Sequence, residues 1–165
     1  MAHLDTMLAW LNDAHALEVN LAQVLENHAK DAKDHPAMQA KIEQHLEQTR
    51  RHAELVKSCI ERLGGSTSTI KSAMGKIGGM VQGISTGPAP DELVKNALAD
   101  YASEHFEIAS YTSLLAGAQA LGDQETARIC QQILQDEIEM ASFLQQNIPM
   151  ITQEYLGMQA REHSA

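Results

Sequence analysis

The feature that most constrains this chain is a pair of glutamates on the apolar face of an expected helix. Between residues 91 and 121, apolar residues recur at spacings of three and four, a pattern that predicts an amphipathic helix facing a core. Glu104 lies within that face and Glu107 lies one turn on, at its edge; the apolar members are Val94, Ala97, Tyr101, Ile108, Tyr111 and Leu115. Because a glutamate is rarely buried unless it is paired, protonated or metal-bound, the rest of the fold must supply partners.

Three further segments show the same helical periodicity. Together the four expected helices span about residues 4–30, 36–63, 91–121 and 124–147. Gly64 and Gly65 end the second as a glycine C-cap does, Asp91 is an expected N-cap for the third, and Pro149 is expected to stop the fourth. A short C-terminal helix is expected over 151–158, followed by a frayed tail at 159–165.

The stretch from residue 64 to residue 90 predicts a long connection. It is rich in Gly, Ser and Thr, with room for one short helix over about 69–82. Short turns make the flanking helices two antiparallel hairpins, and a long crossover lets the third helix start at the opposite end. We therefore expect an all-α, ferritin-like antiparallel four-helix bundle that forms a single domain over residues 1–165.

The charge of the chain argues against two classes of partner. Its formal net charge is −10, whereas nucleic acids and anionic membranes require a positive face. No apolar run reaches the ~18 residues that span a bilayer, and the N-terminus lacks the basic region of a signal peptide. We expect a cytoplasmic protein in which Cys59 and Cys130 are small buried side chains without a redox role.

Polar residues interrupt the apolar faces near the middle of all four expected helices. They are His15 and Glu18, then His45, Gln48, Thr49 and His52, then Glu104 and Glu107, and finally Glu137. In an antiparallel bundle the midpoints of the helices lie at one height, so these groups are expected to converge.

Such a convergence is typical of a carboxylate-rich pair of metal ions. The candidate ligands are Glu18, His45, Gln48, His52, Glu104, Glu107 and Glu137. Four carboxylates offset two divalent cations, and oxygen donors with a few imidazoles favour iron or manganese without excluding zinc. Such a site could oxidise Fe(II) with oxygen or peroxide, with Tyr111 as a nearby hydrogen-bonding or radical residue. The alternative is a polar core network that holds no metal.

The same residues resemble the YciE/YciF family of bacterial ferritin-like stress proteins, and the YciE branch most closely. The stretches that carry the resemblance are Trp10 to Glu18, Ile42 to Thr49, Phe106 to Leu115, Asp136 to Met140 and Gln146 to Pro149. The resemblance implies a four-helix bundle, a homodimer, a link to stress responses and a di-metal site that includes Glu18, Glu107 and Glu137.

The chain departs from the pattern of this family at two positions. The family usually has His-x-x-Glu-Thr in the second helix, whereas here Gln48 stands in place of the glutamate, which removes one negative charge. Met140 stands where a Glu-x-x-His motif would place histidine. Both departures favour the alternative function of a metal-free dimeric stress protein that acts through protein partners.

Overall fold

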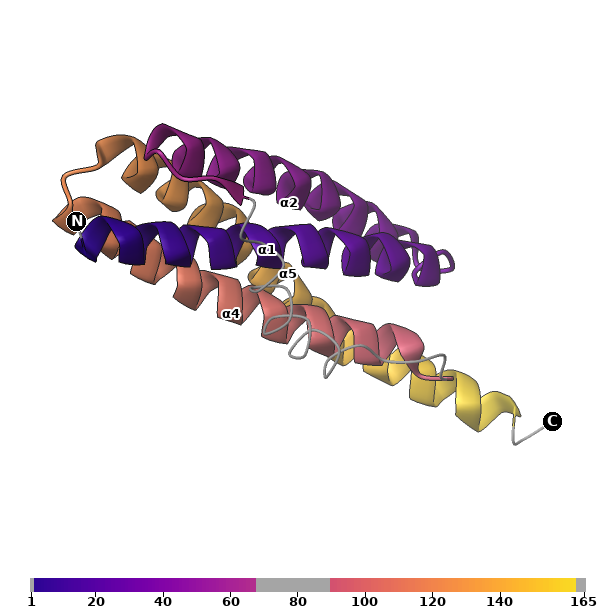
Figure 1. Ribbon diagram of the computed structural model, residues 1–165. Coiled ribbons are helices and arrows are strands. Elements are labelled where there is room, and N and C mark those ends of the chain that lie inside the picture. Colours follow the sequence, from indigo (N-terminus) through magenta and orange to yellow (C-terminus); the bar gives the residue numbers. More distant parts are fainter. Residues whose placement is uncertain (1, 68–89, 163–165) are drawn as a thin grey trace.

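The chain forms an all-α antiparallel bundle (Figure 1). The computed structural model describes residues 2–67 and 90–162, with side chains described for 3–67 and 90–157. Its helices are α1 (Ala2–Asp31), α2 (Pro36–Arg62), α4 (Glu92–Ala120) and α5 (Gln124–Glu162). The expected short helix over 69–82 lies outside the described residues. None of the described helices is long and apolar enough to cross a membrane.

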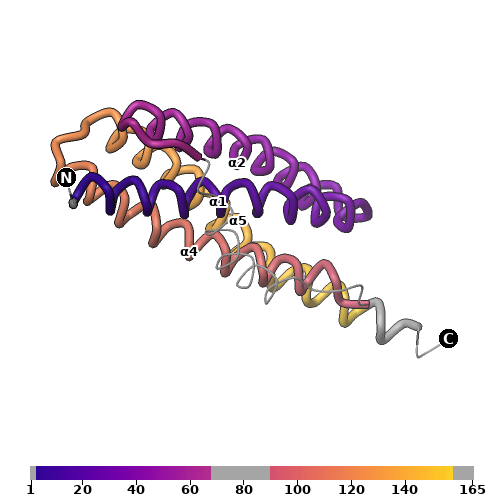
Figure 2. Tube along the Cα trace, viewed as in Figure 1, coloured from indigo at the N-terminus to yellow at the C-terminus, as the bar shows by residue number. Residues whose placement is uncertain are grey.

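The bundle is built from two hairpins. α1 packs mainly against α2, and α4 against α5, while smaller α1–α4 and α2–α5 contacts join the two hairpins. The C-terminal end of α2 and the start of α4 lie at opposite ends of the bundle (Figure 2). The long crossover expected from the sequence is therefore confirmed.

Two glycines end helices where the sequence predicts turns. Gly64 has a φ of +81° and Gly122 a φ of +73°, in the left-handed region that glycine adopts without a Cβ clash. Asp91 occupies the N-cap position of α4, as expected, but its side chain makes no capping hydrogen bond. Its carboxylate instead pairs with Lys95 at 2.8 Å, one turn into the helix.

The prediction that Pro149 separates two helices is wrong, because α5 runs continuously to Glu162. An interior proline removes one backbone hydrogen bond at a cost of about 3 kcal/mol. On either side of it, Leu144 and Ile151 are buried in one apolar cluster. Burial of each such side chain contributes about 1.5–3 kcal/mol, which offsets the cost. The helix also continues through 159–162, where fraying was expected, and residues 163–165 lie outside the described part.

The core consists of two apolar clusters. One lies towards the α4–α5 turn and includes Leu11, Ile60 and Ile133. The other lies towards the α1–α2 turn and includes Leu25 and Ile42. A layer of buried polar side chains separates the two clusters.

The buried face of α4 is rotated relative to the prediction. Tyr101, Ile108 and Leu115, expected inside, are only partly buried. Asp100, Glu107 and Leu114 occupy the core-facing positions instead, together with Ala97, Glu104 and Tyr111. The rotation moves Glu107 from the edge of the face to its centre, among polar groups of the other helices.

Candidate metal centre

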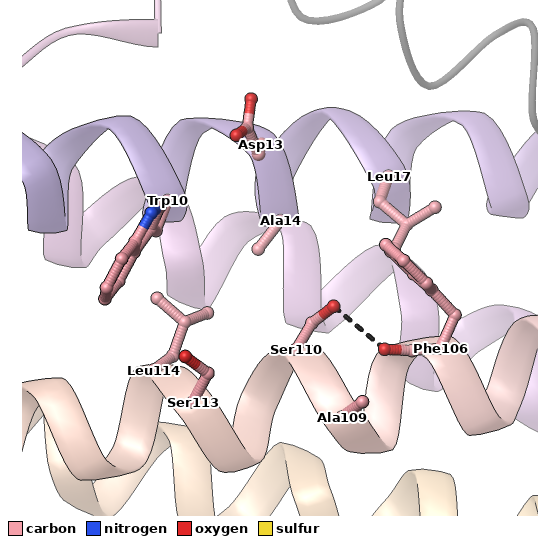
Figure 3. A pocket seen from close by; sticks show the side chains of 9 residues that line it. All are labelled: Trp10, Asp13, Ala14, Leu17, Phe106, Ala109, Ser110, Ser113 and Leu114. Atoms are coloured by element: carbon pink, nitrogen blue, oxygen red, sulfur yellow. Dashed lines mark hydrogen bonds between the residues drawn. The ribbon is translucent and has the colours of Figure 1, made fainter.

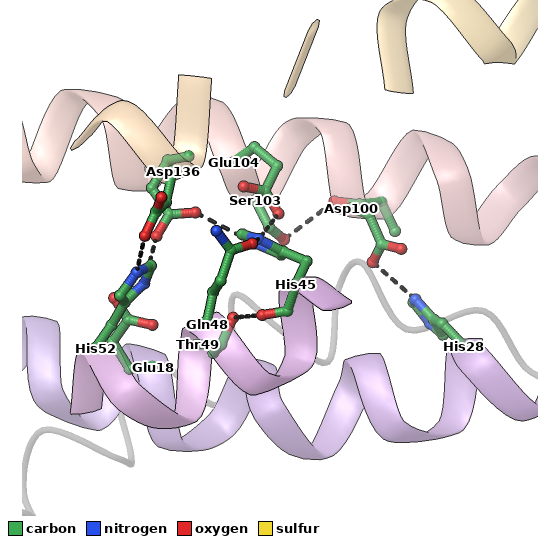
Figure 4. A network of polar contacts seen from close by, with 12 residues as sticks. Glu18, His28, His45, Gln48, Thr49, His52, Asp100, Ser103, Glu104 and Asp136 are labelled. Atoms are coloured by element: carbon green, nitrogen blue, oxygen red, sulfur yellow. Dashed lines mark hydrogen bonds and ion pairs between the residues drawn. The ribbon is translucent and has the colours of Figure 1, made fainter. Parts of the chain in front are cut away.

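The polar layer receives side chains from all four helices (Figure 4). α1 contributes Glu18, α2 contributes His45 and His52, α4 contributes Glu104 and Glu107, and α5 contributes Glu137. Each of these six side chains is at most 2% exposed. Of the nine polar groups predicted to converge, these six meet in the middle of the bundle.

Two triads of potential ligands share one carboxylate, that of Glu137. Glu18, His52 and Glu137 form the first triad, and His45, Glu104 and Glu137 form the second; within each, the ligand atoms lie within 4.8 Å of one another. Oε1 of Glu137 is 2.9 Å from His52 Nδ1, whereas its Oε2 is 3.3 Å from His45 Nε2. Glu137 thus turns one oxygen towards each triad, as a carboxylate that bridges two cations does.

The contacts in the triads are at ion-pair distance but lack hydrogen-bond geometry. His45 Nε2 is 3.1 Å from Glu104 Oε1, and His52 Nδ1 is 3.7 Å from Glu18 Oε1. Both ring nitrogens, and both oxygens of Glu137, are buried without a hydrogen-bond partner. Buried polar atoms are rarely left in this state. Imidazoles and carboxylates that converge in this way without hydrogen-bond partners suit cations, so these residues fit a pair of metal ions.

Glu107 and Tyr111 complete the layer from α4. Oε1 of Glu107 is buried and unpartnered. The Tyr111 hydroxyl donates to Glu18 Oε1 at 2.5 Å, which fixes the orientation of that carboxylate. Tyr111 therefore contacts a member of the first triad directly.

Burial controls the protonation of most of the carboxylates. It raises the pKa of Glu107 well above the usual value, and the neighbouring carboxylates raise it further. Burial also raises the pKa of Glu18 and Glu104, although nearby histidines oppose the change. Without a cation, burial thus shifts these three groups towards the protonated form.

The pKa values of His45, His52 and Glu137 are shifted so that the charged form of each group is favoured. Burial lowers the pKa of His52, but contacts with Glu137 and Glu18 outweigh it and bring the value to about 10. The pKa of His45 is likewise raised well above normal by Glu104 and Glu137, against the effect of burial. Burial would raise the pKa of Glu137, but the two histidines lower it to about 2. Protons thus supply the positive charge that metal ions would supply.

Three further polar residues and the apolar Met140 lie outside the triads. Gln48 is partly buried, and its Oε1 lies 3.4 Å from His45 Nδ1, on the far side of the ring from the triad. Thr49 donates its hydroxyl to the His45 carbonyl oxygen at 3.0 Å. Met140 is fully buried in an apolar cluster. His15 is buried, and its Nδ1 has no hydrogen-bond partner.

Two polar contacts near the layer were not predicted from the sequence. His28 is only 6% exposed, and its Nδ1 lies 2.7 Å from Asp100 Oδ1. Asp136 lies 2.9 Å from His52 Nε2. His28 and Asp100 fall at core-facing spacing from Leu25 and Glu104, a signal that was available. Nothing in the sequence distinguishes Asp136 from an exposed acidic residue.

A separate apolar groove lies on the surface between α1 and α4. It measures about 350 Å³, with Trp10 and Phe106 at its two ends (Figure 3). Asp13 is the one charged side chain among its lining residues. The groove contains none of the triad residues.

The fold and the buried carboxylate layer define the class of protein, a ferritin-like four-helix bundle. Residues 3–157 match the family described as a domain of unknown function, DUF892, and the chain belongs to that family. A solved protein from Xanthomonas campestris is 32% identical with a TM-score of 0.82, and the match covers 97% of this chain and 99% of that one.

Two more distant structures show the same fold. The Escherichia coli stress protein YciF is 19% identical with a TM-score of 0.70, over 90% of this chain and 96% of its own. A dodecameric thioferritin from Bacteroides fragilis is 20% identical with a TM-score of 0.67, over 98% and 90%. The comparisons do not separate the branches of the family, so assignment to the YciE branch stays a prediction.

Proposed function

We propose that this chain is a ferritin-like stress protein that holds two iron or manganese ions in the middle of the bundle. The proposal rests on the orientation of Glu137, whose two carboxylate oxygens face two buried triads. Glu18 and His52 would complete one position, and His45 and Glu104 the other. Glu107 would supply a further carboxylate, and Gln48 would support His45 rather than bind an ion. Zinc remains compatible with this donor set.

The chemistry that fits such a pair is oxidation of Fe(II). Two Fe(II) ions supply two electrons, which with two protons reduce one hydrogen peroxide to two waters. The apolar clusters above and below the layer exclude bulk water from the centre. Tyr111 would hold Glu18 in place through its hydrogen bond and lies near enough to exchange a proton with that carboxylate. This activity fits a protective role in the cytoplasm.

We also propose that two copies of the chain pair through the α1–α4 face. Trp10 and Phe106 are 46% and 45% exposed, an unusual state for two large aromatic side chains on one face. Two chains that each carry a net charge of −10 repel one another. A groove with one carboxylate in its lining lets the two chains approach at a low electrostatic cost.

A second candidate function is a bundle that holds no metal and acts through protein partners. Gln48 and Met140 favour it, because the first replaces a carboxylate and the second is packed as a core residue. In this account the protonated layer sets the register of the helices. Thermal unfolding with and without EDTA separates the two, because a bound ion stabilises the native state and chelation then lowers the midpoint.

The proposal is tested by comparing Glu137→Gln with Glu18→Gln. Because Glu137 serves both triads, its substitution should remove Mn(II) binding at both positions. Glu18 serves one triad, so its substitution should leave one ion per chain. Equilibrium dialysis with metal analysis measures both stoichiometries. An equal number of Mn(II) ions per chain in the two variants would contradict the role of Glu137 as a ligand shared by both positions.

A further inference from the structure

The two histidines of the centre contact different chemical groups through the ring nitrogen that faces away from the triad. His52 turns Nδ1 to its triad, and its Nε2 lies 2.9 Å from a carboxylate oxygen of Asp136. His45 turns Nε2 to its triad, and its Nδ1 lies 3.4 Å from the amide oxygen of Gln48. One imidazole thus has a charged acceptor at short distance and the other a neutral acceptor at long distance (Figure 4).

The acceptor at the second ring nitrogen affects how well a histidine binds a metal ion. A ligand nitrogen must present a lone pair, so the proton of the ring has to reside on the other nitrogen. An acceptor there fixes that tautomer and the orientation of the ring, and it makes the ligand nitrogen more basic. Charge-assisted hydrogen bonds are roughly twice as strong as neutral ones, so a carboxylate has the larger effect.

Asp136 is well placed for this role. It immediately precedes Glu137 on α5, so one turn of helix supplies both a member of the triads and the group that orients His52. The side chain of His52 is fully buried, whereas that of Asp136 is 17% exposed. Arg51 approaches the same oxygen only at 3.7 Å and is itself exposed, so its effect is small.

We infer that Asp136 is a positioning residue that makes the two metal positions unequal. The position formed by Glu18, His52 and Glu137 binds the first ion tightly. The position formed by His45, Glu104 and Glu137 is backed by Gln48 and fills second. This inference rests on the proposed function, since it ranks the two positions that the proposal assigns.

The experiment is a calorimetric titration of the metal-free protein with Co(II), followed also by visible absorption. The wild type should bind two ions in separate steps. Asp136→Asn keeps an acceptor oxygen but removes the charge, so His52 is then held as His45 is. The first step should weaken by about 10- to 100-fold and merge with the second. Glu139→Gln, which removes an exposed charge from the same helix, should leave both steps unchanged.

Three outcomes would overturn the inference while leaving the proposed function intact. They are two Co(II) ions that bind to the wild type in a single step, an Asp136→Asn variant with an unchanged first step, or equal weakening of both steps. A wild type that binds no Co(II) would instead contradict the proposed function itself. Circular dichroism of the metal-free variant at the temperature of the titration should show the helical content of the wild type, so that a weakened first step reflects the site and not loss of the fold.

A second readout does not depend on any variant. In the Zn(II)-loaded wild type, long-range proton–nitrogen NMR should show His52 metallated at Nδ1 and protonated at Nε2. His45 should show the reverse pattern. A metal at Nε2 of His52 would contradict the role of Asp136.

Discussion

At the scale of single residues, the buried carboxyl group of Glu107 lowers the stability of the metal-free protein. Its carboxyl is buried, one oxygen has no partner, and its pKa is raised by burial and by neighbouring carboxylates. An unsatisfied buried polar group costs about 1–3 kcal/mol. Such a group persists where function requires it.

Glu107→Leu should therefore stabilise the metal-free protein and impair metal uptake. Leucine has a similar volume and brings no polar atom, so the free energy of unfolding should rise by about 1–3 kcal/mol. Urea denaturation in the presence of EDTA measures the gain, and dialysis against Mn(II) measures the loss of binding. A variant that is destabilised and still binds two ions would show that Glu107 is a structural residue.

The pKa values of the layer predict how stability depends on pH. Glu18, Glu104, Glu107, His45 and His52 all have raised pKa values in the folded state. A raised pKa contributes stability below the unfolded value, and this is lost as pH rises through the folded value. For His52 that loss extends from 6.5 to about 10. Glu137, with a pKa of about 2, acts oppositely, but only below its usual value of 4.5.

The temperature at the midpoint of unfolding of the metal-free protein should therefore decrease as the pH is raised from 6 to 9. Stabilisation by added Mn(II) should grow over the same range, because the ligands must lose their protons to bind it. Calorimetry with EDTA or Mn(II) at several pH values measures both trends. An unfolding midpoint of the metal-free protein that rises with pH would contradict the raised pKa values of the buried layer.

At the scale of helices, the buried pair of His28 and Asp100 joins α1 to α4, and so one hairpin to the other. His28→Leu leaves the Asp100 carboxylate buried without its imidazole. Removing one partner of a buried pair costs about 3–5 kcal/mol. Urea denaturation should show that loss, and the double variant with Asp100→Leu should recover much of it.

The exposed pair of Lys95 and Asp91 is the matched control for this prediction. It also lies on α4, and Lys95→Ala should change stability by less than about 1 kcal/mol. A loss for His28→Leu no larger than that of the control would mean that this buried pair joins the hairpins no more strongly than an exposed ion pair does.

The helices and the level of the polar layer could be predicted because both follow from periodicity and from the short turns. The rotation of α4 could not, because Tyr101 and Asp100 fit equally well at adjacent positions of a repeating pattern. The choice between them depends on partners such as His28, which belong to another hairpin. The continuity of α5 across Pro149 likewise depends on tertiary packing of Leu144 and Ile151, which outweighs a local preference.

At the scale of the whole molecule, the α1–α4 face predicts self-association. A stable interface buries about 800 Å² per partner and tolerates few unpaired charges at its centre. Trp10→Glu combined with Phe106→Glu places two carboxylates there and should give a monomer in sedimentation velocity. Leu156→Glu is the control, because Leu156 is 60% exposed on α5 and is not part of the groove. A wild-type monomer, or a dimer that survives the double substitution, would exclude this face.

Metal content shows whether two ions bind between the triads that share Glu137. The protein is purified without an affinity metal, stripped, reloaded anaerobically with Fe(II), and analysed by mass spectrometry. We expect about two irons per chain, as in other ferritin-like carboxylate centres, and an optical change when oxygen is admitted. Iron at background level after reloading would contradict it and leave a bundle whose core is held in register by protons.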